Sequence, residues 1–271
     1  MRGLVLVLLG LLLIATPAAA GGKLELDGTF AQGGLVKGLT EPGAKVTLDG
    51  RTIRVDRWGR FVFGFGHDAG KEAVLRVVYP SGEEEVRKLE IRQRKYNIQR
   101  IDGLPQKMVT PDPEVLARIR RENAQIAEAR RRDTDAAWFW DGFKRPAEGR
   151  ITGVYGSQRI LNGEPKQPHF GIDFAGPRGS TVVAPAPGIV VLAEEDHYYT
   201  GKTVLIDHGH GINSVLMHLD SISVKPGTRV EAGDPIGTIG ATGRATGPHL
   251  DWRVNWFNVR LDPGFLIGEV Q

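Results

Sequence analysis

A histidine and an aspartate stand two residues apart in the segment GRATGPHLDWRVNW. If this segment is a strand, Leu250 and Trp252 face one side and His249 and Asp251 face the other, because side chains alternate along a strand. Burial of the apolar side would leave the imidazole and the carboxylate together on the open side. Imidazole nitrogen and carboxylate oxygen both bind Zn²⁺, so this pair suggests a metal site.

Two other segments repeat this arrangement. In PHFGIDFAG, His169 and Asp173 fall opposite three apolar residues. In SVLMHLD, alternation places Met217 on the core face and His218 on the opposite face. Three strands would then each direct a histidine away from the core, which favours one shared site over three unrelated histidines.

These side chains are sufficient for a catalytic zinc site, which has three protein ligands and keeps a fourth position for water. Additional histidines can act as the general base or stabilise a developing oxyanion. A serine hydrolase is disfavoured because the chain has no G-x-S-x-G turn. The helical H-E-x-x-H zinc motif is absent as well.

The chain begins with MRGLVLVLLGLLLIATPAAAGG, which is typical of a secretory signal peptide. We expect residues 1–20 to be removed; a membrane anchor is the alternative, but its apolar run is shorter than the roughly 20 residues of a span. There is no cysteine, which excludes lipid attachment through a thiol as well as disulfides. The net charge of +3 permits an anionic partner without identifying one. We expect no membrane span after signal cleavage and no nucleic-acid partner.

The rest of the chain divides by pattern into two β-rich parts and a linker. Residues 21–95 contain short strands separated by turn sequences such as TEPGA, which predicts a small immunoglobulin-like β-sandwich. His67 stands alone in one of these turns and is expected to be solvated. Residues 96–149 are predicted to be a linker with a helix, N-capped by Asp112; a solvated helix is the first interpretation, and binding of an anionic polymer is the alternative. Residues 150–271 favour antiparallel β structure, so the predicted fold class is mainly β.

Residues 150 to about 266 resemble the LytM/lysostaphin-type zinc metallopeptidases of peptidase family M23. HFGIDFA matches the family's H-x-x-x-D element, and TVVAPAPGIVVLA matches its V-x-A-P-x-x-G-x-V hairpin. TGKTVLIDHGHGINSVLMHL matches the segment that ends in a catalytic His-Leu. VKPGTRVEAGDPIGTIGATGRATGPHLDW matches the run that ends in H-L-H-W. The resemblance implies a C-terminal antiparallel β metallopeptidase domain with a barrel-sandwich-like architecture.

The resemblance also implies roles for individual residues. His169 and Asp173 would be zinc ligands, and His218 and His249 would be catalytic. The family's third ligand is the second histidine of H-x-H, and Asp251 occupies that position here. Two carboxylates would balance the charge of Zn²⁺ fully, so this ligand set predicts a weaker Lewis acid than two histidines and one aspartate.

Four further polar residues receive lesser roles. Arg159 and Arg253 are candidates for binding a substrate carboxylate, because guanidinium suits bidentate recognition. His208 and His210 are interpreted as structural, with His210 as a spare ligand if Asp251 does not bind.

The resemblance implies an exported zinc metalloendopeptidase, periplasmic or extracellular, that cleaves peptide cross-links between peptidoglycan stem peptides during cell-wall remodelling. The alternative is a non-enzymatic, degenerate LytM-type domain that binds or activates a separate wall hydrolase. Position 251 separates the two hypotheses. A lost ligand favours the alternative, whereas aspartate can still bind zinc and both catalytic histidines are retained.

Overall fold

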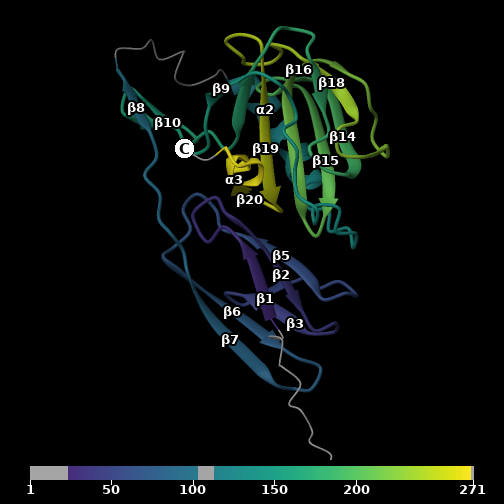
Figure 1. The fold of residues 1–271 in the computed structure, drawn as a ribbon. Helices are drawn as coiled ribbons and strands as arrows, with labels where there is room; N and C mark the ends of the chain where they lie inside the picture. The colour runs from purple at the N-terminus through teal and green to yellow at the C-terminus, as the bar shows by residue number, and fades with distance from the viewer. Residues whose placement is uncertain (1–23, 103–112, 270–271) are drawn as a thin grey trace, which may run out of the picture.

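The computed structural model describes residues 24–102 and 113–269. Its ribbon shows two β-rich parts, the N-terminal strands at the bottom and the C-terminal strands at the top (Figure 1). The predicted fold class, mainly β with antiparallel sheets, is confirmed. The predicted signal peptide, residues 1–20, and the predicted N-cap, Asp112, lie outside the described residues.

Two small antiparallel sheets form the N-terminal part, in the orders β1-β2-β5 and β4-β3-β6-β7. Their strands are β1 (Leu24–Gly28), β2 (Leu35–Thr40), β3 (Lys45–Leu48), β4 (Arg51–Ile53), β5 (Arg60–Gly64), β6 (Glu72–Val78) and β7 (Glu84–Glu90). Alternation along β5 and β6 buries Phe61, Phe63 and Leu75 completely. The more specific immunoglobulin-like topology stays a prediction.

The C-terminal part is dominated by a ten-stranded sheet with the central order β17-β14-β15-β16-β19-β12-β9. Strand β13 pairs with β18, β18 with β16, and β20 with β19. The strands are β9 (Arg150–Gly153), β12 (Ile172–Ala175), β13 (Thr181–Val183), β14 (Gly188–His197), β15 (Gly201–Gly209), β16 (Ile212–Ile222), β17 (Arg229–Val230), β18 (Pro235–Ile239), β19 (His249–Trp256) and β20 (Val259–Leu261). The short helix α3 (Pro263–Ile267) follows β20.

The segment between the two parts contains a strand as well as the expected helix. Strand β8 (Ile98–Ile101) pairs in parallel with β10 (Gln158–Leu161), which also pairs with β11 (Glu164–Pro165). The sequence pattern did not indicate β8. The helix α2 (Pro113–Ala129) follows it.

The apolar faces predicted for β12 and β19 are confirmed. Phe174, Leu250, Trp252 and Val254 are all completely buried. The faces predicted for β16 are wrong, because Leu216 pairs with Trp252 while Met217 pairs with Asp251. Directly paired residues share a face, so Leu216 belongs to the main core and Met217 lies on the face that carries Asp251.

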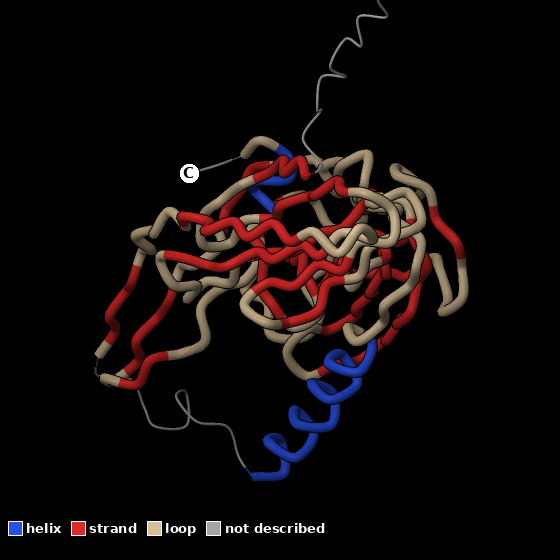
Figure 2. Tube along the Cα trace, turned by 90° about the horizontal axis from the view of Figure 1, so that it is seen from below, coloured by secondary structure: helices blue, strands red, loops and turns tan. Residues whose placement is uncertain are grey.

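Helix α2 packs against part of this second face of the sheet. Ile126 packs with Leu205, Val215 and Met217 in a buried cluster that is separate from the main core. Seen from below, the C-terminal end of the helix reaches the strands (Figure 2). In the part of the chain that the structure describes, no helix combines the length and apolar character needed to cross a membrane.

The two β-rich parts contact each other through buried polar and aromatic residues. His67 stacks on Tyr96 with ring centroids 4.0 Å apart, and its side chain is 14% exposed. The expectation that His67 is a solvated loop residue is therefore wrong, because the second domain and the strand-forming linker cover the turn. Arg94, at the end of the N-terminal part, reaches across to Asp262, with 2.7 Å between Nη1 and Oδ2.

We expect Asp262→Ala to lower the free energy of unfolding by about 3–5 kcal/mol, because it leaves the Arg94 guanidinium buried without its partner. Asp262 is buried and also N-caps α3 by accepting a hydrogen bond from Gly264 N at 2.8 Å. Denaturant unfolding measures the change. Asp27→Ala is the matched control, since Asp27 pairs with Lys37 at 3.7 Å but is 86% exposed, and its loss should be about 0–1 kcal/mol. Equal effects for the two variants would contradict the prediction.

Candidate metal centre

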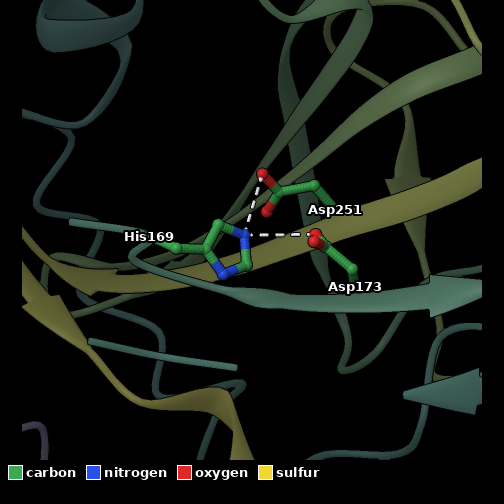
Figure 3. A group of neighbouring side chains, drawn as sticks. All are labelled: His169, Asp173 and Asp251. Carbon is green, nitrogen blue, oxygen red and sulfur yellow. Dashed lines mark ion pairs between the residues drawn. The ribbon is translucent and has the colours of Figure 1, made fainter. Parts of the chain in front are cut away.

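Three sequence-predicted ligands come together where β12 lies beside β19. Asp173 and Asp251 are directly paired across these strands, and His169 stands just before β12. Nε2 of His169 lies 3.1 Å from Oδ1 of Asp173 and 3.3 Å from Oδ2 of Asp251 (Figure 3). One ligand atom from each residue fits within 4.8 Å of the others.

The buried polar atoms of this group fit a metal ion. Within the residues that the structure describes, Nε2 of His169 and Oδ1 of Asp173 are buried and make no hydrogen bond. Buried polar atoms are normally hydrogen-bonded, so these two atoms, which meet each other only as an ion pair, are suited to bind one shared cation. An imidazole and two carboxylates form a donor set that suits zinc.

Two glycines make room for the carboxylates. A Cβ atom at Gly153 would collide with Asp173 Oδ2, and one at Gly171 would come 2.5 Å from Asp251 Oδ1. Neither glycine was predicted from the sequence to be a site residue. The sequence feature that could have revealed them is their position in or beside a strand, where a glycine often allows another group to approach the backbone closely.

The charges of the group are strongly coupled. Burial opposes the charge of His169, but attraction to Asp251 and Asp173 prevails and raises the pKa of His169 to about 10. Burial also opposes ionisation of Asp251, but Arg253 and His169 hold its pKa well below the usual range. The group without metal therefore holds a protonated His169 imidazole beside the ionised carboxylate of Asp251.

Arg253 is bound to Asp251. Its Nη2 donates to Asp251 Oδ2 at 2.6 Å, and its Nε donates to Oδ1 at 3.1 Å. Arg159 is exposed on β10, and none of the contacts among the described residues joins it to the group. Substrate binding by Arg159 and by Arg253 stays a prediction.

His218 and His249 stand beside the group with their ring centroids 4.7 Å apart. Nε2 of His249 lies 4.0 Å from Asp173 Oδ1. Nδ1 of His218 is 2.8 Å from Thr242 O, and Nδ1 of His249 is 2.8 Å from Gly247 O. A carbonyl oxygen can only accept, so each Nδ1 carries a proton and each Nε2 is left for the reaction.

A β-bulge brings His218 to this position. Strand β16 pairs Leu216 with Val204 and Leu219 with Lys202, so Met217 and His218 together oppose one residue of β15. The backbone of His218 has φ 62°, which is uncommon for a residue other than glycine. The extra residue restores His218 to the face of Asp251, although strict alternation after Met217 would turn it toward the core. Burial lowers the pKa of His218, so the imidazole is neutral near pH 7.

His208 and His210 lie outside the metal group. His208 is completely buried, with Nδ1 2.7 Å from Pro187 O and Nε2 2.8 Å from Ser214 Oγ. His210 stands at the turn between β15 and β16, and its Nε2 is 3.0 Å from Asp135 O. These contacts agree with structural roles for both residues.

Comparisons with known proteins agree with the geometry. The sequence pattern of Peptidase family M23 matches residues 167–263, which carry all five residues of the site. The peptidoglycan DD-endopeptidase ShyA of Vibrio cholerae is 44% identical over 87 residues, 32% of this chain and 20% of the relative. The DD-carboxypeptidase/endopeptidase Mpg of Neisseria meningitidis is 40% identical over 89 residues, again 32% of this chain and 20% of the relative. The matched region thus spans about a fifth of the length of these curated relatives.

A solved structure is similar over nearly the whole chain. It is described as a peptidase M23 from Pseudomonas aeruginosa and is 30% identical in sequence, with a TM-score of 0.69. The alignment covers 89% of this chain and 96% of the solved one. Because the alignment covers nearly all of this relative at 30% identity, and because the family pattern includes the site itself, this chain belongs to peptidase family M23.

Proposed function

We propose that the protein is an exported zinc metalloendopeptidase that hydrolyses peptide cross-links of peptidoglycan. The observation that carries the proposal is the convergence of His169, Asp173 and Asp251 beside two histidines whose Nε2 atoms are available. The curated relative ShyA, a peptidoglycan DD-endopeptidase, supports the substrate class. Export rests on the signal-like sequence of residues 1–20.

His169, Asp173 and Asp251 would hold the zinc ion. When bound, Zn²⁺ supplies a Lewis acid that polarises the peptide carbonyl and acidifies water. His218 acts as general base, because it is neutral near pH 7 and its Nδ1–H is held by Thr242 O. His249, whose Nδ1 is held by Gly247 O, would direct Nε2 toward the developing oxyanion and stabilise it.

Arg253 compensates for the aspartate at position 251. Two carboxylates would cancel the charge of Zn²⁺, whereas the guanidinium on Asp251 returns one positive unit to the site. The Asp251–Arg253 pair thus carries the same net charge as the neutral histidine of H-x-H. This argument favours the enzyme over the non-enzymatic alternative, which rests on Asp251 being a lost ligand.

Digestion of purified peptidoglycan sacculi tests the proposal. The zinc-loaded protein should release soluble peptides and expose new amino groups, and a chelator should stop the release. Zinc binding without any hydrolysis, combined with stimulation of a separate wall hydrolase, would instead establish the non-enzymatic alternative.

Zinc binding at pH 7 should release about one proton per ion. His169 has a pKa of about 10 in the metal-free protein, so it is protonated at pH 7, and a ligand imidazole must be neutral. The apparent zinc affinity should therefore rise about tenfold per pH unit as the pH increases toward that pKa. Calorimetry in buffers of different ionisation enthalpy counts the proton. Zinc binding with no proton release would remove His169 from the ligand set.

A further inference from the structure

The face of β19 that carries Asp251 continues with two more polar residues. Side chains at alternate positions share a face, so Arg253 and Asn255 follow Asp251 on it. Arg260 of β20 is paired directly with Asn255, and its Nη1 donates to Asn255 Oδ1 at 2.7 Å. The guanidiniums of Arg253 and Arg260 therefore lie on the same face as the metal group.

Helix α2 adds a third guanidinium to this face. Ile126 packs on Val215, which is paired with Arg253 across β16 and β19. Arg130 follows one helical turn later, where its backbone N donates to Ile126 O. It is only 7% exposed, and its charge interacts with those of Arg260 and Arg253.

Two of the three positive charges are not balanced by the described residues. Asp251 pairs with Arg253, but no described carboxylate lies within ion-pair distance of Arg130 or Arg260. Nε of Arg130 is buried without a hydrogen-bond partner in the described part of the chain. Burial, followed by the charges of Arg260 and Arg253, lowers the pKa of Arg130 to about 8. A buried cation without a partner is costly to the folded state, so its presence points to a ligand that supplies the missing negative charge.

We propose that Arg130, Arg253 and Arg260 form a carboxylate-binding subsite that holds a free carboxylate of the peptide substrate beside the metal centre. Guanidinium groups match a carboxylate in planar, bidentate geometry, and Arg253 already touches Asp251. The carboxylate comes either from the end of the peptide or from an acidic side chain. The identity of the substrate rests on the proposed function, whereas the anion site rests on the three arginines.

Calorimetry with matched peptides tests the subsite. The experiment uses the metal-loaded full chain carrying His218→Ala, because this substitution prevents turnover of the peptides. The probes are a short peptide ending in a free carboxylate, its C-terminal amide, and the same pair with a glutamate side chain replaced by glutamine. One of the acidic forms should bind about 10–100-fold more tightly than its amide, as expected for hydrogen bonds between charged groups. Arg130→Gln should remove this preference.

Arg131→Gln is the matched control, because Arg131 is the next residue but is 71% exposed and paired with Glu128. It should keep the preference for the acidic peptide. Equal binding of acids and amides, no binding of any peptide, or a preference unchanged in Arg130→Gln would overturn the proposal. A protein that prefers the acidic peptide but does not digest sacculi would leave the subsite standing and refute the proposed function.

Thermal unfolding distinguishes a ligand-binding role of Arg130 from a purely structural role. Arg130→Met removes the uncompensated charge, so the melting temperature without ligand should stay the same or rise. The rise in melting temperature caused by the acidic peptide should disappear in this variant. Arg260→Gln should also lose that rise. A melting temperature that falls in Arg130→Met, with the ligand effect retained, would make Arg130 a packing residue and overturn the proposal.

Discussion

His218→Ala should lower turnover of peptidoglycan peptides about 10²–10⁴-fold while leaving the zinc content unchanged. Nε2 of His218 is available to the reaction, and the side chain contacts His249 without belonging to the ligand group. Loss of this imidazole removes the group that accepts a proton from the attacking water. Initial rates on purified cross-linked peptides, together with metal analysis, separate the two quantities.

The pH profile adds a readout specific to a general base. In the native protein, kcat/KM should fall at low pH as His218 becomes protonated, and burial places this limb below the usual histidine range. The limb should vanish in His218→Ala. His67→Ala is the control, because that imidazole stacks on Tyr96 and belongs neither to the ligand group nor to the pair of His218 and His249. Loss of zinc together with activity in His218→Ala would make His218 a ligand and contradict the assignment.

Asp251→Ala should weaken zinc binding by about 100-fold or more, since even the supporting partners of metal ligands contribute 10–100-fold. The variant loses a ligand and also leaves the Arg253 guanidinium unpaired beside the cation. Competition with a chelator measures the affinity. Zinc retained in Asp251→Ala but lost in His249→Ala would show that His249 is the ligand, and it would favour the non-enzymatic alternative.

A substitution of Arg253 tests whether its charge compensates for the aspartate at position 251. Arg253→Met should retain zinc, because all three ligands remain, but the positive charge near the attacking water falls by one unit. The pH for half-maximal activity should therefore rise by about one unit. The single replacement Asp251→His should not produce an ordinary H-x-H site, because Arg253 then faces a cation and a neutral imidazole. Adding Arg253→Met to Asp251→His should restore zinc affinity, and failure to do so would refute charge compensation.

Several features of the site followed from the sequence alone. Alternation along a strand is a local property, so the apolar residues of β12 and β19 were sufficient to place Asp173 and Asp251 on the opposite face. The pairing of these two strands then brings the carboxylates side by side. The residues of the metal group and the mainly β fold were thus predictable from pattern and from resemblance to a family.

Tertiary structure decided what depends on neighbouring strands and on the linker. The faces of β16 were predicted wrongly because its register with β19 and the bulge at His218 are set by pairing, which no local pattern records. The contact between Arg253 and Asp251 depends on the orientation of the Arg253 side chain, which is set by the residues that bury it. Arg130 comes near Arg253 and Arg260 because the end of α2 packs on the sheet, although it lies more than a hundred residues from them in sequence. The alternation of side chains along a strand can be read from consecutive residues. The contacts described here arise only when distant segments bury their surfaces against one another.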